Sequence, residues 1–140
     1  MKDRVAQVAF IGALVLALAL LPTAIAANRG GGGGKAGSAT GSFTLVLLNS
    51  TDGLPHYGQD VTFDVTSNAY HPMVRLTCYQ NGDWVKNQSV GFYAGWPWSQ
   101  VFPLSSYKWP GGAADCNATL YYQTNRGEQV LDTMSFATYA

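Results

Sequence analysis

Apolar and polar residues alternate along much of the chain beyond residue 42. In the segment 61–66 each apolar side chain is followed by a threonine or an aspartate, and the segments 74–79 and 116–120 alternate similarly. A period of two places successive side chains on opposite faces of a β-strand, with one face buried. No segment of this region shows the period of 3.6 residues that an amphipathic helix requires. The pattern therefore predicts an all-β domain.

Turn-forming residues separate the alternating segments. Asn81-Gly82 is the strongest such signal, because a two-residue hairpin of type I′ needs positive φ at both central residues. Short strands at regular intervals are typical of an antiparallel β-sandwich, and a closed barrel is the alternative. We expect about seven strands, at residues 43–48, 60–66, 73–80, 84–90, 98–104, 115–124 and 128–138.

The start of the chain has the pattern of a secretory signal peptide at residues 1–26. A basic beginning precedes an apolar run from Val8 to Leu21, and small residues lead to Ala26. The apolar run is shorter than the roughly 20 residues that span a bilayer. Cleavage after Ala26 is therefore favoured over retention as a membrane anchor.

Residues 27–42 are rich in glycine and carry no large apolar side chain, with five consecutive glycines at positions 30–34. Such a segment cannot bury enough apolar surface to offset its conformational entropy, so we expect a flexible linker. A phosphate-binding loop would need a preceding strand and a following helix, and neither is indicated. Residues 43–140 then form one domain. The leader and the glycine tract are typical of a bacterial protein.

Charged residues are few in the predicted domain. Residues 43–140 hold four Lys or Arg and seven Asp or Glu, which leaves a net charge of −3. Nucleic acids and anionic membrane surfaces are bound through clusters of basic residues, and the sequence of this domain has none. We therefore expect neither nucleic acid nor, after signal cleavage, a membrane as a partner.

The chain holds two cysteines, Cys78 and Cys116, and both fall on the apolar face of a predicted strand. In an exported domain such a pair is expected to form a disulfide, worth about 4 kcal/mol of stability for a loop of this length. Zinc sites use about four ligands at close spacing, and the histidines are only His56 and His71. The sequence thus predicts a structural bridge and no metal.

Neither histidine lies in a catalytic pattern. His56 follows Pro55 and His71 precedes Pro72 in predicted loops, with no G-x-S-x-G element to supply a nucleophile. A carboxylate pair of the glycosidase kind is the alternative, but acidic residues on outward strand faces are usually solvated. We therefore expect no enzyme activity and no cofactor. The carboxylates considered are Asp60, Asp64, Asp115 and Asp132.

The number of predicted strands, the length of the domain and its two cysteines resemble the immunoglobulin-like and fibronectin III-like β-sandwich superfamily. Tyr121 and Tyr122 in the penultimate predicted strand add to the likeness. The resemblance implies two packed antiparallel sheets. In antibody-type domains the cysteines bridge the second and sixth strands, whereas Cys78 falls in the third predicted strand and the Asp-x-x-x-Tyr-x-Cys signature is missing. The bridge is therefore expected between neighbouring strands of one sheet, unless the strand count is off by one.

Aromatic residues concentrate between residues 92 and 99. Trp96 and Trp109 each precede a proline in a loop rich in glycine and proline, so we expect them to be exposed. Trp84 and Trp98 each begin a predicted strand, so we expect them to be buried or packed at an edge. Exposed rings are stacking platforms for sugars or anchors for proteins, unless they only cover an open end of the sandwich. The candidate ligand-binding residues are Tyr93, Trp96, Trp98 and Trp109.

These observations together predict a secreted or cell-surface, non-catalytic module of immunoglobulin-like fold, with a role in protein interaction or in structure. The alternative is a carbohydrate-binding module that uses the exposed tryptophan and tyrosine rings. The expected partner is accordingly an extracellular protein or a polysaccharide.

Overall fold

The structure, a computed structural model, describes residues 38–140; the predicted signal peptide and most of the predicted linker lie outside the described residues. The described chain forms seven strands and no helix, and so contains no helix that is long and apolar enough to cross a membrane. The prediction of an all-β domain is confirmed. The strands are β1 (Gly41–Leu47), β2 (Asp60–Ser67), β3 (Met73–Gln80), β4 (Asp83–Gly91), β5 (Phe102–Pro103), β6 (Ala114–Thr124) and β7 (Gly127–Thr138).

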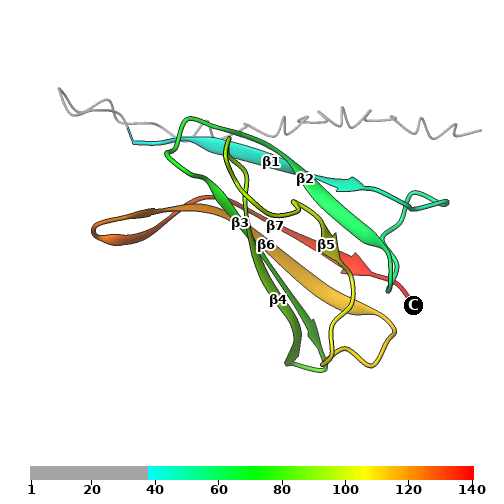
Figure 1. Cartoon of the computed structure of the whole chain (residues 1–140). Coiled ribbons are helices and arrows are strands. Elements are labelled where there is room, and N and C mark those ends of the chain that lie inside the picture. Colours follow the sequence, from blue (N-terminus) through cyan, green and yellow to red (C-terminus); the bar gives the residue numbers. More distant parts are fainter. Residues whose placement is uncertain (1–37) are drawn as a thin grey trace, which may run out of the picture. The chain divides into compact units, whose positions relative to one another are not determined.

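The strands form two antiparallel sheets, which Figure 1 shows as two layers. One sheet has the strand order β1-β2-β5 and the other has the order β4-β3-β6-β7. Because alternate side chains of each strand are apolar, the two apolar faces meet and the core lies between the layers. Its fully buried side chains include Val61 and Phe102 from the first sheet, and Val74, Leu76, Ala118 and Leu120 from the second.

The predicted disulfide between Cys78 and Cys116 is present. The two residues lie directly opposite each other on β3 and β6, with their Cα atoms 4.0 Å apart and both side chains buried. The bridge therefore joins neighbouring strands of one sheet, as the sequence predicts, and it links the two central strands of the larger sheet.

The hairpin prediction is also confirmed. Asn81 and Gly82 have φ angles of 51° and 86°, the positive values that a type I′ turn requires, and they join β3 to β4. At the other end of the domain β1 begins at Gly41, before the predicted start at residue 43. Gly41 pairs with Ser67, so this part of the predicted linker belongs to the sheet.

The strand predicted at residues 98–104 is shorter in the structure, where only Phe102–Pro103 pairs with β2. Residues 97–100 are exposed and do not alternate between buried and exposed positions. Ser99 Oγ accepts the N–H of Val101 at 3.3 Å, which takes up a donor that a longer ladder could use. The segment therefore remains a loop, and this loop carries part of the candidate site.

Candidate functional site

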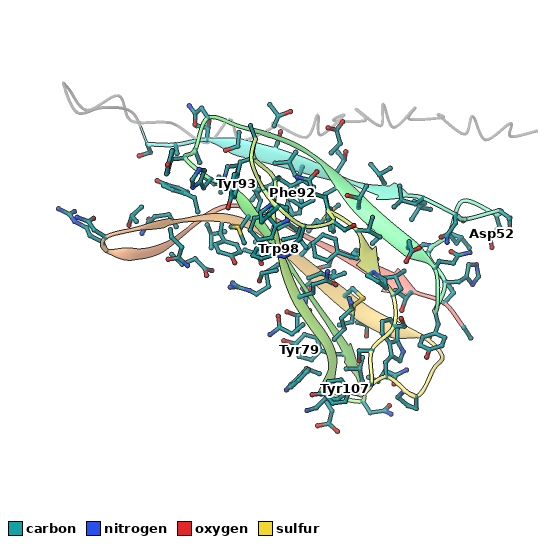
Figure 2. All side chains as sticks on the ribbon, in the orientation of Figure 1. Asp52, Tyr79, Phe92, Tyr93, Trp98 and Tyr107 are labelled. Atoms are coloured by element: carbon teal, nitrogen blue, oxygen red, sulfur yellow. A yellow bond between two sulfur atoms is a disulfide. The ribbon has the colours of Figure 1, made fainter. Side chains whose placement is uncertain are left out.

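Five aromatic side chains from two loops form a continuous row of ring contacts. The loop between β2 and β3 supplies Tyr70 and His71, and the loop after β4 supplies Tyr93, Trp96 and Trp98. The ring centroids lie 3.8 Å apart for Tyr70–His71 and 4.0 Å apart for His71–Tyr93, and both pairs are stacked. Trp96 meets Tyr93 edge-on at 5.6 Å, and Trp98 meets Trp96 edge-on at 4.8 Å. We call these five residues the aromatic row; Figure 2 labels Tyr93 and Trp98.

One backbone hydrogen bond joins the two loops, and a second shapes the turn that follows. The N–H of Phe92 donates to the carbonyl of Pro72 at 2.8 Å and joins the loops beside the row. A turn follows, in which the N–H of Trp96 donates to the carbonyl of Tyr93 and Gly95 has a φ of 89°. Glycine adopts this positive φ without a steric penalty. The main chain therefore fixes the positions from which the side chains of Tyr93 and Trp96 extend.

The ends of the aromatic row are open to solvent and its middle is partly covered. Tyr70 is 78% exposed and Trp98 is 70% exposed, whereas Tyr93 and Trp96 are half-buried. The indole N–H of Trp96 is buried, and no acceptor among residues 38–140 bonds to it. An unpaired buried donor costs about 1–3 kcal/mol, so the ring contacts of Trp96 must offset that loss.

Gly91, at the end of β4, leaves the space into which the row packs. A Cβ atom here would lie 2.4 Å from a ring carbon of Trp96 and 2.6 Å from one of Tyr93. Gly91→Ala should displace both rings and lower the free energy of unfolding, measured with urea, by about 1–3 kcal/mol. The control Ser89→Ala, exposed on the same strand, should change it by less than about 0.5 kcal/mol. Equal effects of the two substitutions would contradict this packing.

One predicted ligand-binding residue does not belong to the row. Trp109 is 2% exposed, so the prediction that it is exposed is wrong. Its indole N–H donates to the carbonyl of Gly112 at 3.1 Å, and Gly111 and Gly112 have φ angles of 117° and 83°. These positive φ angles let the chain turn back toward the ring. The structure brings together the other three predicted residues, which are Tyr93, Trp96 and Trp98.

Two further tryptophan predictions need correction. Trp96, predicted to be exposed, is half-buried and packed against the core. Trp98 begins no strand and is largely exposed, contrary to the prediction. Trp84, in contrast, lies at an edge, on strand β4, which is one of its two predicted alternatives. It is 45% exposed, with the ammonium of Lys108 3.6 Å from its ring centroid. The sequence does not predict Tyr70 and His71 as site residues. Their place in the row depends on contacts with a loop about 20 residues later in the chain, and no local pattern indicates such contacts.

A polar cluster holds the end of the described chain against the loop between β1 and β2. His56 Nε2 lies 2.7 Å from Asp52 Oδ2, and His56 Nδ1 lies 2.9 Å from an oxygen of Ala140. The bond from His56 lowers the pKa of Asp52 to about 2, and the bonds to Ala140 and Asp52 raise the pKa of His56. Ser50 Oγ donates to the carbonyl of Leu54 and to Asp52, not to the imidazole. The cluster therefore pairs no nucleophile with a base and acts as a clamp.

The clamp should weaken as the pH rises through the pKa of His56. Because this pKa is raised above its ordinary value of 6.5, the protonated imidazole stabilises the fold fully below that pH and less above it. Asp52 contributes above its ordinary pKa of 3.8, and this contribution is lost as the pH falls toward about 2. The thermal unfolding midpoint should therefore decline as the pH rises above about 6.5 and through the raised pKa of His56. His56→Gln should remove most of this decline, and an equal decline in that variant would contradict the role of His56.

Within residues 38–140, no three His, Cys, Asp or Glu side chains gather closely enough to hold a metal ion. The chain matches no protein-family model, no curated protein and no solved structure. The aromatic row offers ring stacking and apolar contact from loops that are joined by the main chain. These are the properties of a binding surface.

Proposed function

We propose that this chain is an exported, non-catalytic module of immunoglobulin-like fold that binds an extracellular protein. The observation that carries the proposal is the aromatic row, which is exposed at both ends and held in place by ring stacking and by a backbone hydrogen bond between its loops. Tryptophan and tyrosine are enriched among the residues that contribute most of the binding energy at protein interfaces. Rings that are already ordered lose little conformational entropy when a partner binds.

Stacking within the row favours a protein partner over a sugar. The interplanar angles are 26° for Tyr70–His71 and 22° for His71–Tyr93, so these rings cover much of one another's faces. A sugar ring stacks on an open aromatic face, whereas a protein partner can also pack against ring edges. The exposure of Trp98 favours polysaccharide binding as the second candidate function.

Export is supported by the signal-peptide pattern at residues 1–26 and by the disulfide, because such bridges persist in oxidising compartments. The fold assignment is supported by two antiparallel sheets of three and four strands. In constant-type immunoglobulin domains the fourth strand joins the sheet of the first two, whereas β4 pairs with β3 here. The assignment therefore concerns the architecture, and the function rests on the aromatic row.

The proposal is tested by the retention of extracellular proteins on the immobilised full chain. The double variant Tyr70→Ala/Trp98→Ala removes both exposed ends of the row, and Tyr107→Ala removes a ring outside it that is 92% exposed. Truncating an aromatic residue that contributes strongly to binding costs about 2 kcal/mol, so the double variant should bind at least about 30-fold more weakly. Tyr107→Ala should bind the same partner as the unaltered chain does.

Undiminished retention by the double variant would overturn the proposal of protein binding. Retention on an insoluble polysaccharide, abolished by Trp98→Ala, would establish the second candidate function instead. The unfolding midpoint of each variant is measured alongside, because Tyr70 and Trp98 are exposed and their removal should leave the fold intact.

A further inference from the structure

A second aromatic region lies at the opposite end of the β3–β4 hairpin from the aromatic row. Figure 2 shows Tyr79 and Tyr107 near the turn of this hairpin, away from Tyr93 and Trp98. Here β4 is the edge of its sheet, and the segment 104–108 is attached along it. Ser106 Oγ donates to the carbonyl of Val85, and Lys86 Nζ donates to the carbonyl of Ser105.

A pocket of about 420 Å³ lies between this segment and β4. The residues around it are two aromatic residues, two with side-chain amides, a serine and a lysine, and no acidic residue is among them. The lining residues are Trp84, Lys86, Asn87, Gln88, Ser106 and Tyr107.

A β-bulge explains why a lysine lies in this pocket. The register of β3 and β4 shifts so that Trp84 pairs with Tyr79 and Lys86 pairs with Cys78, which leaves Val85 between them without a partner. Lys86 therefore shares the core-facing side of the sheet with Cys78, whereas Trp84, paired with the exposed Tyr79, lies on the outer face of the same edge strand.

The ammonium group of Lys86 has few hydrogen-bond and ionic partners for a buried charged group. Lys86 is 5% exposed, and its ammonium has one acceptor among residues 38–140, the Ser105 carbonyl at 3.3 Å. No carboxylate of the described chain lies within ion-pair distance of it. Burial lowers its pKa, although the charge of Asp60 opposes this effect. A buried ammonium is stabilised when a neighbouring anion balances its charge and each of its N–H groups has a hydrogen-bond acceptor.

The rest of the pocket suits a sugar ring. Tyr107 is 92% exposed and Trp84 is 45% exposed, so Tyr107 and the face of Trp84 that Lys108 does not cover can offer a surface for stacking. Asn87 lies beside them and can bond to hydroxyl groups. Lys108, over the Trp84 ring at 3.6 Å, adds a second positive charge near the pocket.

We infer that this pocket binds an acidic saccharide, a uronate unit of a polysaccharide, which lies across the edge of β4 with its carboxylate at Lys86 on one side and its ring at Trp84 on the other. The site is separate from the aromatic row and does not depend on the function proposed for that row. The carboxylate supplies the negative charge and the hydrogen-bond acceptor that the buried ammonium of Lys86 lacks. The aromatic rings and side-chain amides then favour an anion that carries a sugar ring over one that does not.

The test is a titration of the full chain with a uronate oligosaccharide, followed by the fluorescence of its tryptophans. The comparison ligands are a neutral glucose oligosaccharide of equal length and a glutamate peptide of equal charge. We expect the uronate to bind at least tenfold more tightly than either ligand. Lys86→Met, which keeps the shape of the side chain without its charge, should weaken uronate binding at least tenfold, and Trp84→Ala should do the same.

Tyr70→Ala, in the aromatic row, is the matched control and should leave uronate binding unchanged. A chain that binds no uronate at millimolar concentration overturns the inference, as does uronate binding that survives both Lys86→Met and Trp84→Ala. Equal affinity for the glutamate peptide overturns it as well, because charge alone would then account for binding. Unfolding midpoints of the variants near that of the unaltered chain exclude loss of the fold as the cause.

Discussion

Replacing Cys78 and Cys116 together by alanine should lower the free energy of unfolding by about 4 kcal/mol. The bridge closes a loop with a sequence separation of 38 residues, and removing it restores conformational freedom to the unfolded chain. In the folded chain the bridge joins the two central strands of the four-stranded sheet. Urea denaturation of the unaltered chain and the double variant measures the loss of stability.

The unaltered chain in its reduced state is the matched control, because it loses the bond but keeps both sulfur atoms in the core. If the reduced chain unfolds at nearly the same urea concentration as the double variant, the loss of stability is due to the bridge itself. Equal stability of the oxidised and reduced chains would contradict this account.

Trp109→Ala should lower the free energy of unfolding by about 3–5 kcal/mol, the range for truncating a buried aromatic side chain. The ring is 2% exposed and belongs to the same buried cluster as the disulfide. Its N–H bonds to Gly112, and the edge of Tyr57 lies against it with ring centroids 5.3 Å apart. The substitution therefore leaves a cavity and an unpaired carbonyl.

Trp98→Ala is the matched control for this prediction, because Trp98 is 70% exposed. Its removal should change the free energy of unfolding by no more than about 0.5 kcal/mol. Urea denaturation of both variants measures how much each tryptophan contributes to the free energy of unfolding. Equal losses would mean that Trp109 is no more important to the core than a surface ring.

The strands were predictable because the core lies between two sheets and each strand buries one face. Alternation in the segments 61–66 and 74–79 follows directly from that arrangement. The turn at Asn81-Gly82 was predictable because its positive φ angles restrict the residues that fit. The segment 98–101 misled the prediction, since its apolar residues serve a loop surface rather than a strand.

The candidate site was predictable only in part, because it depends on contacts between loops. Trp96 and Trp98 lie in one segment, so their association follows from proximity in the sequence. His71 joins them only because the chain brings the loop before β3 beside the loop after β4. Trp109 is buried by a turn whose glycines resemble those of an exposed loop. The pocket at Lys86 depends on a bulge that breaks the alternation of β4.

The most direct test of the aromatic row as the binding surface is hydroxyl-radical footprinting of the full chain, resolved by residue with mass spectrometry. In the free chain, Tyr70 and Trp98 should be oxidised rapidly and Trp109 should be protected, as their exposures require. Addition of the retained partner should protect Tyr70 and Trp98 and leave Tyr107 unchanged. Slow oxidation of Trp98 in the free chain, or undiminished oxidation of both Tyr70 and Trp98 in the complex, would contradict the account.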